Sequence, residues 1–324
     1  MKNQVLLLLK ENAGQFISGS FISSKLGISR AAVWKIVQNL QAEGFTIEAV
    51  TRRGYRLTHA PDRLVPGNIL PLLAKEHAPH VICFPSISST NDYAKTYSCP
   101  DLKKNYYFAA EEQTGGRGRR GRSFYSPPGT GLYLTGLYHP QIDPSAASIF
   151  TAYAAVAVCR AVEEVCGFSP DIKWPNDILW KGRKLCGILT EMALEGESRS
   201  IQYMISGIGV NVGQEEADFP EDIREIAGSL KMAAGKAPRR DALCAALINE
   251  LEKAYEGFLK TDPSYRSFYE SRCITLEKDI FIITAQEKTP AFAEALSDDF
   301  GLVARYEDGR RETVYAGEVS SRLQ

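Results

Sequence analysis

The sequence lacks closely spaced cysteine pairs, and this bounds both its redox setting and its metal chemistry. Its seven cysteines are scattered over the chain, and none belongs to a C-x-x-C pair. Disulfide frameworks and structural zinc sites depend on regular spacings of this kind, so we expect neither. A reducing cytoplasm is the simplest setting for such a chain.

Long apolar runs are also missing. The run Val5–Leu9 is too short for the apolar core of a signal peptide, because Lys10 and Glu11 end it. The most apolar later run, around residues 146–162, is broken by charges such as Arg160. It therefore predicts a buried helix of a globular protein and no membrane span.

Internal repeats and low-complexity segments are absent too. At 324 residues the chain is too long for one ordinary core, and its length predicts two or three domains. Its 44% hydrophobic and 24% charged residues are typical of a soluble globular protein.

A large excess of either charge is missing from the whole chain, whose formal net charge is −1, but the charges are unevenly placed. Through His59 the chain has eight lysines and arginines against three glutamates, a net charge of +5 that leaves −6 for the remainder. A basic module on an acidic body predicts contact with nucleic acid at one end only.

The first 60 residues show the pattern of a helix-turn-helix. Val5–Lys10 begins a first helix, and Phe21–Leu26 forms a second, which Ser20 caps and Gly27 ends. Ser29 caps a third helix, in which apolar residues recur at helical spacing. Two helices joined by a short glycine turn are the sequence form of a helix-turn-helix.

A basic hairpin follows these helices. Residues 46–50 and 55–57 flank the turn Thr51–Gly54 and predict a wing that reaches the DNA backbone. An alternative is a small helical interaction domain whose charges are only solvated, but the wing and the charge asymmetry favour DNA binding. Donors suited to phosphates and base edges lie on the third helix and in the turn: Arg30, Lys35, Gln38, Asn39, Arg52 and Arg53.

Residues 115–122 alternate glycine with arginine. Glycine allows the backbone to approach a ligand closely, and arginine supplies a planar cation, so the loop is suited to close over an anion. Its glycines imitate a dinucleotide-binding fingerprint and nearly a P-loop, but both motifs require a helix after the loop. Here Ser126–Gly129 and a second strand, Leu132–Leu134, follow instead, which excludes both. A solvated basic loop is the alternative.

From His80 onward strands and helices alternate, and polar side chains stand at the strand ends. Residues 88–91 follow a strand and either cap the next helix or bind a polar ligand head. The strand at 171–180 is interrupted by Trp174–Asp177, which carries too much polar chemistry for a plain sheet. Lys184 begins the next strand, and a lone lysine at a strand edge is usually only solvated. It becomes a candidate site residue only in combination with the arginine loop and Asp177.

Four segments in order closely resemble the biotin protein ligases. The winged helix in front makes the resemblance one to the bifunctional kind, which also represses the biotin operon. It covers essentially the whole chain, and the ordered set is very specific although each motif alone is weak. The segments are Ser89–Asn91, Gln113 with Gly116–Gly121, Lys173–Asp177, and Arg183–Gly187.

The resemblance implies ATP-dependent chemistry in two steps. The carboxylate of biotin attacks ATP and gives biotinoyl-5′-AMP and pyrophosphate, which brings two anions together. Preorganised cations offset that repulsion. The acyl group then passes to a lysine of a biotin carboxyl carrier protein or domain, and this step needs a deprotonated amine.

The resemblance also implies roles for individual residues. Ser89, Thr90 and Gln113 bind the ureido head of biotin, and Lys184 lies near the biotin carboxylate and the α-phosphate. Asp177 serves either Mg²⁺ or the incoming lysine, and both readings stay open. The catalytic set is Lys184, Arg119 and Asp177. The set that binds biotin and its adenylate is Ser89, Thr90, Asn91, Gln113, Gly116, Arg117, Gly118, Arg119, Lys184, Gly187 and Asn211.

The chain departs from the family in one place. The family folds an apolar loop over the adenine, whereas Gln214–Phe219 here is largely acidic. The sequence therefore does not identify the side chains that cover the adenine.

The C-terminal part predicts helices and then short strands. Arg239–Leu259 is an amphipathic helix, and Tyr265–Tyr269 is a second short one. Asp308–Gly309 marks a hairpin, and strands at this spacing predict a small barrel, which matches the SH3-like domain of the family. A structural cap on the central sheet is the alternative to a catalytic role. The expected strands are 280–283, 291–295, 302–306 and 313–315.

We therefore expect an α+β protein. A winged helix-turn-helix occupies residues 1–60, a linker 61–79, a class II synthetase-like biotin ligase domain with a mixed β-sheet 80–270, and an SH3-like barrel 271–324. The resemblance implies biotin as substrate, ATP and Mg²⁺. It also implies a carrier protein as acceptor, operator DNA, and a homodimer when the adenylate is bound.

Two other functions remain open. One is a biotin-sensing repressor that has lost ligation, although the retained Lys184, Asp177 and arginine loop argue against it. The other is a lipoate ligase, since lipoate ligases share the catalytic architecture. The glycine–arginine loop and Ser89–Asn91 fit a polar ureido ring better than a thin apolar tail.

Overall fold

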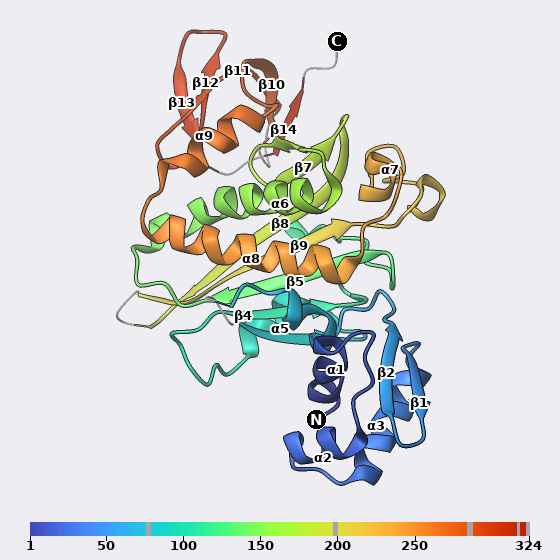
Figure 1. The fold of residues 1–324 in the computed structure, drawn as a ribbon. Coiled ribbons are helices and arrows are strands. Elements are labelled where there is room, and N and C mark those ends of the chain that lie inside the picture. Colours follow the sequence, from blue (N-terminus) through green and yellow to red (C-terminus); the bar gives the residue numbers. More distant parts are fainter. Residues whose placement is uncertain (76–78, 197–199, 284–287, 316–317, 322–324) are drawn as a thin grey trace.

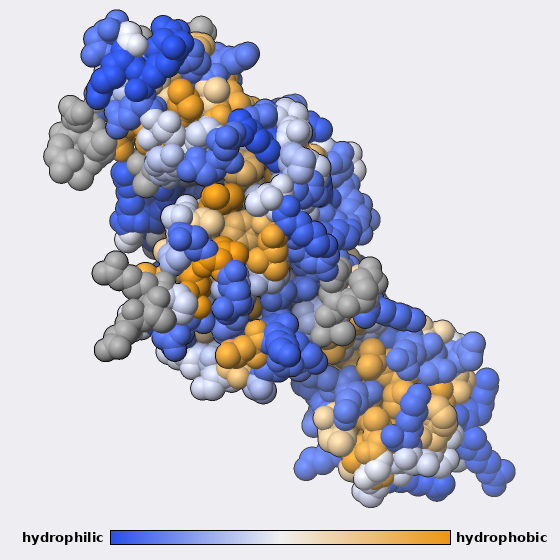
Figure 2. Space-filling model, turned by 90° about the vertical axis from the view of Figure 1, so that its left-hand side faces the viewer, coloured by the Kyte–Doolittle hydropathy of each residue, from blue (hydrophilic) through white to orange (hydrophobic). Residues whose placement is uncertain are grey.

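The structure is a computed structural model that describes residues 1–75, 79–196, 200–283, 288–315 and 318–321. Three parts follow one another along the chain, with the N-terminus in the lowest part and the C-terminus in the highest part of the view in Figure 1. The N-terminal part stands apart from the body as a lobe on which polar and apolar side chains mix (Figure 2).

The N-terminal lobe is a winged helix, as the sequence predicted. Its own small core includes Val5, Ile22 and Val37, all fully buried. Ser29 caps the third helix as predicted, but Ser18 and not Ser20 caps the second, because the Ser18 hydroxyl accepts from the N–H of Phe21. The elements are α1 (Lys2–Glu11), α2 (Gly19–Leu26), α3 (Arg30–Ala42), β1 (Thr46–Val50) and β2 (Gly54–His59).

The segment after the wing packs tightly against both neighbours. It contains α4 (Pro66–Ile69) and the 3₁₀ turn η1 (Leu70–Leu72), and α4 lies between α1 and α8 (Arg240–Leu259). A Cβ added at Gly67 would lie 2.6 Å from a methyl carbon of Leu6, so glycine is needed for this close approach. The sequence predicted a linker here, and its helical turn was missed.

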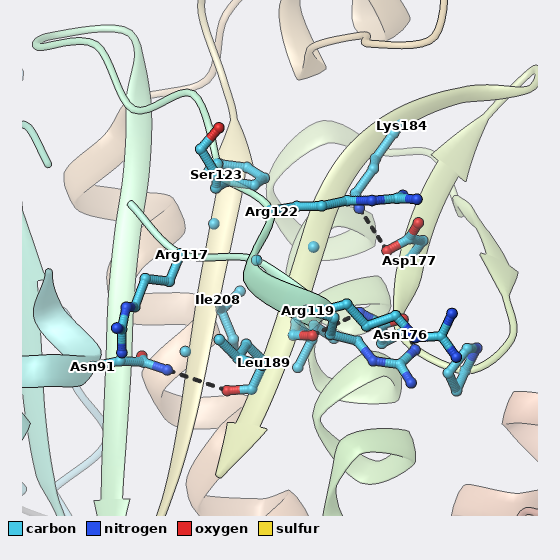
Figure 3. Close-up of a pocket in the computed structure, with 18 of the residues that line it drawn as sticks. Asn91, Arg117, Arg119, Arg122, Ser123, Asn176, Asp177, Lys184, Leu189 and Ile208 are labelled. Atoms are coloured by element: carbon cyan, nitrogen blue, oxygen red, sulfur yellow. Dashed lines mark hydrogen bonds and ion pairs between the residues drawn. The ribbon is translucent and has the colours of Figure 1, made fainter. Parts of the chain in front are cut away.

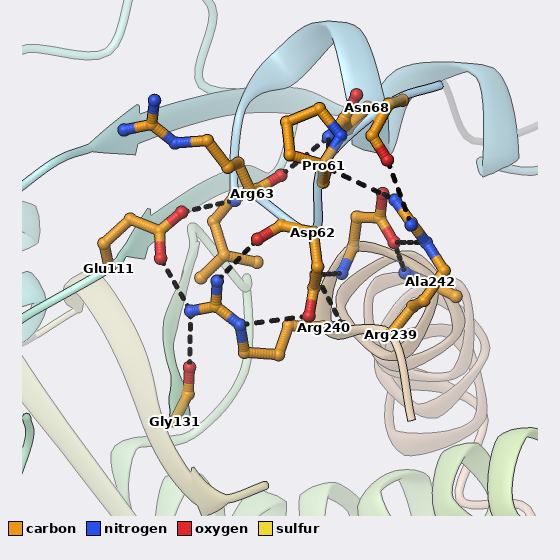
Figure 4. A network of polar contacts seen from close by, with 12 residues as sticks. Pro61, Asp62, Arg63, Asn68, Glu111, Gly131, Arg239, Arg240 and Ala242 are labelled. Atoms are coloured by element: carbon orange, nitrogen blue, oxygen red, sulfur yellow. Dashed lines mark hydrogen bonds and ion pairs between the residues drawn. The ribbon is translucent and has the colours of Figure 1, made fainter. Parts of the chain in front are cut away.

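A buried ionic network joins this segment to the central domain (Figure 4). Arg240 is only 4% exposed, and its guanidinium pairs with Glu111 at 2.6 Å and with Asp62 at 3.3 Å. Glu111 also accepts a hydrogen bond from the N–H of Leu64 at 2.7 Å. Removing one partner of such a buried pair leaves an uncompensated charge, at a typical cost of about 3–5 kcal/mol. The network therefore fixes where the winged helix is attached.

The central domain is a seven-stranded mixed sheet with helices on both faces (Figure 1). The helices α6 (Phe150–Cys166) and α8 pack against each other over one face, and α5 (Thr90–Thr96) covers the other. Among the described strands of this sheet, β3 and β4 pair in parallel and the other neighbours pair antiparallel. In sheet order the strands are β3 (His80–Phe84), β4 (Tyr106–Ala110), β5 (Gly131–Tyr138), β9 (Ile201–Asn211), β8 (Arg183–Leu194), β7 (Asp177–Trp180) and β6 (Asp171–Lys173).

The apolar run expected as a buried helix forms the turn η3 (Pro144–Ile149) and α6. The stretch Pro144–Cys166 is long and apolar enough to cross a membrane, but 67% of its most apolar window is buried inside the protein. It therefore serves as a core helix, as the sequence predicted.

The C-terminal part is an antiparallel five-stranded sheet, which fits the expected small β domain. The helix α9 (Pro263–Arg272) leads into it, and the indole N–H of Trp174 donates to the carbonyl of Phe300 at 2.9 Å across the domain boundary. In sheet order the strands are β13 (Arg311–Val314), β12 (Leu302–Tyr306), β11 (Lys288–Leu296), β10 (Lys278–Ile283) and β14 (Glu318–Ser321). The sequence missed the last of these. Three short segments complete the described elements: η2 (Arg119–Gly121), η4 (Glu216–Asp218) and α7 (Leu230–Ala234).

Candidate active site

One cavity gathers most of the residues predicted to carry chemistry (Figure 3). Its volume is about 170 Å³, and it lies between the start of α5, the glycine–arginine loop, residues 173–177 and strands β8 and β9. The predicted site residues that line it are Ser89, Thr90, Asn91, Gln113, Arg117, Gly118, Arg119, Asp177, Lys184 and Gly187. Segments as far apart in the sequence as Ser89 and Gly209 thus meet around a single space.

Two predicted residues support the cavity without lining it. The Asn211 amide donates to the carbonyls of Lys184 and Gly228, at 3.3 and 3.0 Å, and so joins β9 to the chain beside β8. Gly116 lies at a turn where an added Cβ would come within 2.5 Å of the Phe124 carbonyl oxygen. Both positions shape the backbone behind the site.

The end of the cavity near α5 holds a side-chain amide in a fixed orientation. The N–H of Thr90 donates to Gln113 Oε1 at 2.9 Å, and Gln113 Nε2 donates to the Ser126 hydroxyl at 3.2 Å. That hydroxyl in turn donates to the Phe124 carbonyl at 2.9 Å. Because each neighbour accepts or donates in one sense only, the Gln113 oxygen faces Thr90 and its nitrogen faces Ser126.

Thr135, which the sequence did not single out, lies behind this amide on β5 and is fully buried. Its hydroxyl is 2.8 Å from the Thr90 hydroxyl and 2.6 Å from Asn91 Oδ1, and the Thr90 hydroxyl is 3.0 Å from Gln113 Oε1. The amide oxygens only accept, so three contacts share two hydroxyl protons. The row of Gln113, Thr90, Thr135 and Asn91 is therefore one proton short. A ligand N–H that donates to Gln113 Oε1 would free the Thr90 hydroxyl proton for Thr135 and so complete the row.

Asn91 anchors the far end of this row. Its amide nitrogen donates to Glu191 at 3.0 Å and to the Leu189 carbonyl at 3.4 Å, which fixes its oxygen toward Thr135. A Cβ added at Gly207 would meet that oxygen at 2.0 Å, so only glycine admits the contact. Asn91 therefore positions its neighbours as well as lining the cavity.

The glycine–arginine loop lines one part of the cavity, and its own arginines hold it in place. Arg117 pairs with Asp92 at 2.8 Å, and Arg119 donates to Asn176 Oδ1 at 2.9 Å. Arg120 has φ of 56°, which carries the chain through the tight turn η2 (Arg119–Gly121). The sequence correctly excluded a long helix here, because the loop runs on through an extended segment into β5.

A lysine and a carboxylate stand together at the other end. Lys184 Nζ lies 2.7 Å from Asp177 Oδ1, and their side chains are 35% and 25% exposed. The register of β7 and β8 places Lys184 opposite Leu179, and Asp177, two residues before Leu179, lies on the same face of β7. The pair therefore stays accessible from the cavity, and Lys184 offers a cation there.

Phe124 forms an apolar floor that the sequence also missed. A Cβ at Gly209 would meet its ring at 2.5 Å, and one at Gly187 would lie 3.5 Å from it. The ring thus rests on two glycines of adjacent strands, next to polar groups at either end. The cavity suits an elongated ligand with a polar head and an apolar middle.

Ion pairs hold the segment Gln214–Phe219, which takes the place of the family's apolar adenine loop. Glu216 pairs with Arg183 at 3.0 Å, and Glu215 pairs with Lys231 at 2.5 Å. Phe219 is 2% exposed and Gln214 is fully buried, so neither presents a free surface. Within the described part of the chain, no partner is found for either polar atom of the Gln214 amide.

The polar side chains predicted to contact DNA are all exposed on the winged helix. Arg30, Lys35, Gln38 and Asn39 point away from the core on α3, while Arg52 and Arg53 lie at the tip of the hairpin. Sequence reasoning missed Trp34, which is 57% exposed one turn after Arg30 and one turn before Gln38. The exposed side chains of this lobe are thus mainly basic and polar, and a large aromatic ring lies among them on α3.

Comparisons with known proteins show which families the two regions of the chain resemble. Residues 83–211 match the Biotin/lipoate A/B protein ligase family, and residues 2–56 match an HTH domain family. The chain is 37% identical over 260 residues to the bifunctional ligase/repressor BirA of Bacillus subtilis, covering 80% of this chain and 79% of that protein. It is 29% identical over 310 residues to the Escherichia coli protein of the same name, covering 95% and 94%.

A solved structure is similar in fold to about three quarters of the chain. The biotin protein ligase from Aquifex aeolicus in complex with biotin and ATP has a TM-score of 0.63 and 25% sequence identity. The match covers 76% of this chain and 99% of that one.

Proposed function

The chain belongs to the family of bifunctional biotin protein ligases and repressors, and we propose which of its residues perform each activity. It is an ATP-dependent ligase that forms biotinoyl-5′-AMP and transfers biotin to a lysine of a carboxylase carrier domain. It is also a repressor of biotin genes that binds DNA through its winged helix. The cytoplasm is the setting we propose for both.

The observation that carries the residue assignment is the row of polar side chains at the α5 end of the cavity, formed by Gln113, Thr90, Asn91 and the buried Thr135. The three contacts among Gln113, Thr90, Thr135 and Asn91, at 3.0, 2.8 and 2.6 Å, share only two hydroxyl protons. A cyclic urea brings N–H donors, so its head completes the row where a purely apolar head leaves it short. Ser89, buried at the start of α5, lies beside this head. The apolar middle of biotin then lies on Phe124.

Adenylation takes place at the other end of the cavity, next to the cations of Lys184 and Arg119. The carboxylate oxygen of biotin attacks the α-phosphorus of ATP, an O–P bond forms, and pyrophosphate leaves. Lys184 and Arg119 stabilise the charge shared by the two anions as they meet, and this stabilisation counts most in the transition state. Arg117 and Gly118 belong to the loop that covers the product.

Magnesium fits this end of the site through one carboxylate. Mg²⁺ is usually held by one or two carboxylates together with substrate phosphates, and Asp177 lines the cavity 2.7 Å from Lys184. No cluster of three or more potential metal ligands occurs among the described residues, so most of the ion's ligands come from ATP and water. When bound, the ion neutralises phosphate charge.

The winged helix binds operator DNA, and we propose that two copies pair when the adenylate is bound. Among the described residues, strand β8 pairs with β7 as far as Gly187, and residues 189–194 have no strand beside them on that side. Met192 and Leu194 are 43% and 45% exposed there. A second copy that pairs with this edge extends the sheet and supplies the two-fold symmetry that palindromic operators require.

Linkage makes the dimer a test of the switch. If the adenylate orders the loop and favours the dimer, then the dimer tightens adenylate binding by the same factor. Sedimentation of the protein with and without biotin and ATP measures the first effect. An unchanged monomer–dimer equilibrium contradicts the switch and leaves both the ligase and the DNA-binding assignments standing.

Incubation of the purified protein with labelled biotin or labelled lipoate, ATP and a carrier domain tests the enzyme. We expect biotin on the carrier lysine and pyrophosphate in solution. Label from lipoate, or biotin binding without pyrophosphate, would contradict the assignment of the polar row and of Lys184, respectively.

A further inference from the structure

A second cavity, of about 200 Å³, lies on the other side of residues 174–176 from the first. It is bounded by η3, the start of α6, strand β8 and the loop before β12 of the C-terminal domain. The residues that line both cavities are Arg119, Trp174, Pro175, Asn176, Ile188 and Leu189. The two spaces therefore share a wall.

A hydrogen-bonded pair forms the polar part of this wall. Arg119 Nη1 donates to Asn176 Oδ1 at 2.9 Å, and Asn176 Nδ2 donates to the Ile188 carbonyl at 2.7 Å. Figure 3 shows Arg119 and Asn176 side by side, next to the Asp177–Lys184 pair. A group that crosses the wall at Arg119 thus arrives beside the cations assigned to adenylation.

The second cavity is lined by hydroxyl groups. The hydroxyls of Thr151 and Thr190 lie 2.9 Å apart, and the Tyr269 hydroxyl donates to the Pro175 carbonyl at 3.2 Å. Burial raises the pKa of Tyr269 well above its usual value, so this hydroxyl stays neutral. Ser148 is exposed at the rim.

The charge of the lining changes from the rim to the shared wall. Asp299 belongs to the C-terminal domain; burial alone raises its pKa, but hydrogen bonds from Ser297 and Tyr315 lower it below the usual value. Its carboxylate is therefore charged at neutral pH. At the wall the charge is the guanidinium of Arg119.

We propose that this second cavity is the passage through which the acceptor lysine side chain reaches the adenylate, an inference that rests on the proposed ligase function. During transfer the first cavity is filled by biotinoyl-5′-AMP under the glycine–arginine loop. The lysine nucleophile must therefore approach from another side, and we place that approach at the wall shared by the two cavities.

The lining suits a long, unbranched chain that ends in an amine. Asp299 attracts the ammonium at the rim, and the hydroxyls of Thr151 and Thr190 accept its N–H groups further in. Near Arg119 the like charge and the loss of water both disfavour the ammonium form, so the lysine arrives as a neutral amine. Asn176 offers its amide oxygen to that amine when Arg119 turns to the phosphate.

The transfer step then balances without a further reactant. The amine nitrogen attacks the carbonyl carbon of the mixed anhydride, and a C–N bond forms as the C–O bond to the phosphate breaks. AMP leaves with the electron pair of that bond, and the amine loses one proton to water. The product is the amide of the carrier lysine.

The test separates transfer from adenylation. In Ser148→Trp an indole narrows the rim of the second cavity at an exposed position. Ser145→Trp is the matched control, because Ser145 is also exposed in η3 and lines neither cavity. Pyrophosphate release without acceptor and biotin transfer to a carrier domain are measured for both variants and the wild type.

We expect Ser148→Trp to form the adenylate at the wild-type rate and to lose about 10²-fold in transfer, since a blocked approach removes the near-attack geometry. We expect Ser145→Trp to perform both steps normally. Thr151→Met narrows the same cavity from inside and is predicted to behave like Ser148→Trp.

Two results would overturn the proposal: unimpaired transfer by both Ser148→Trp and Thr151→Met, or an equal loss of transfer in Ser145→Trp. A wild-type protein that released no pyrophosphate with biotin and ATP would instead refute the proposed function. The two failures are therefore distinguishable in one set of assays.

Discussion

Replacement of Thr135 by valine tests the polar row in the most direct way. Valine keeps the shape of the side chain and removes the hydroxyl that lies 2.8 Å from Thr90 and 2.6 Å from Asn91. The Asn91 oxygen then loses its short contact, and leaving a buried acceptor unsatisfied costs about 1–3 kcal/mol. In a domain of this size, 1 kcal/mol lowers Tm by roughly 2–4 °C.

The effect on ligand binding follows from the proton count. Without Thr135 the Thr90 hydroxyl donates to Gln113 Oε1 at all times, and the row no longer lacks a proton. The ligand N–H therefore gains less from binding, and we expect biotin to bind about tenfold more weakly, a loss of about 1.4 kcal/mol. The rate at saturating biotin should change little, because Lys184 and Arg119 are untouched.

Calorimetry with biotin, pyrophosphate release at saturation and thermal melting give the three readings. Thr135→Ser keeps the hydroxyl and should restore biotin affinity. An N-methylated biotin should bind the wild type poorly and lose much less in Thr135→Val. If valine weakened biotin and its N-methyl analogue by the same factor, the hydroxyl would have only a packing role and the proton count would be wrong.

Three further substitutions test the remaining assignments. Lys184→Ala should lower pyrophosphate release by about 10²–10³, the usual loss of a preorganised charge contact, with little change in Tm. Lys181→Ala, which removes an exposed lysine outside the cavity, is its control, and normal release by well-folded Lys184→Ala would remove Lys184 from the site. Arg119→Gly should release the adenylate faster and place biotin on bystander proteins, because the loop no longer keeps water and stray amines out. Adenylate escape at the wild-type rate would contradict this retention role. Trp34→Ala should weaken operator binding about tenfold through lost contact with thymine methyl groups. Its salt dependence and its ligase activity should not change, whereas an equal loss on unrelated DNA would show that the ring only supports the fold.

Local patterns in the sequence determined many elements of this protein. Ser29 followed by apolar residues at helical spacing specified α3, and the turn at Arg52 and Arg53 specified the wing, because caps and turns depend on near neighbours. The order of the polar motifs indicated the family. It also named most residues that line the first cavity, since each motif carries its chemistry within a few residues.

Contacts between distant segments decided the rest. Thr135 looked like an ordinary strand residue, and only the packing of α5 on β5 brings its hydroxyl to Thr90. Gly116 and Asn211 share their segments with lining residues, but their backbone positions place them behind the cavity. The Ser18 cap lay two residues from the serine that the pattern favoured.

The second cavity is the clearest case of what the sequence alone could not give. Its walls come from η3, β8 and the C-terminal domain, so it exists only because Trp174 and Phe300 join two domains. No local pattern encodes such a space, because each lining residue satisfies an ordinary role in its own segment. Tertiary packing sets both its shape and the change of charge along it.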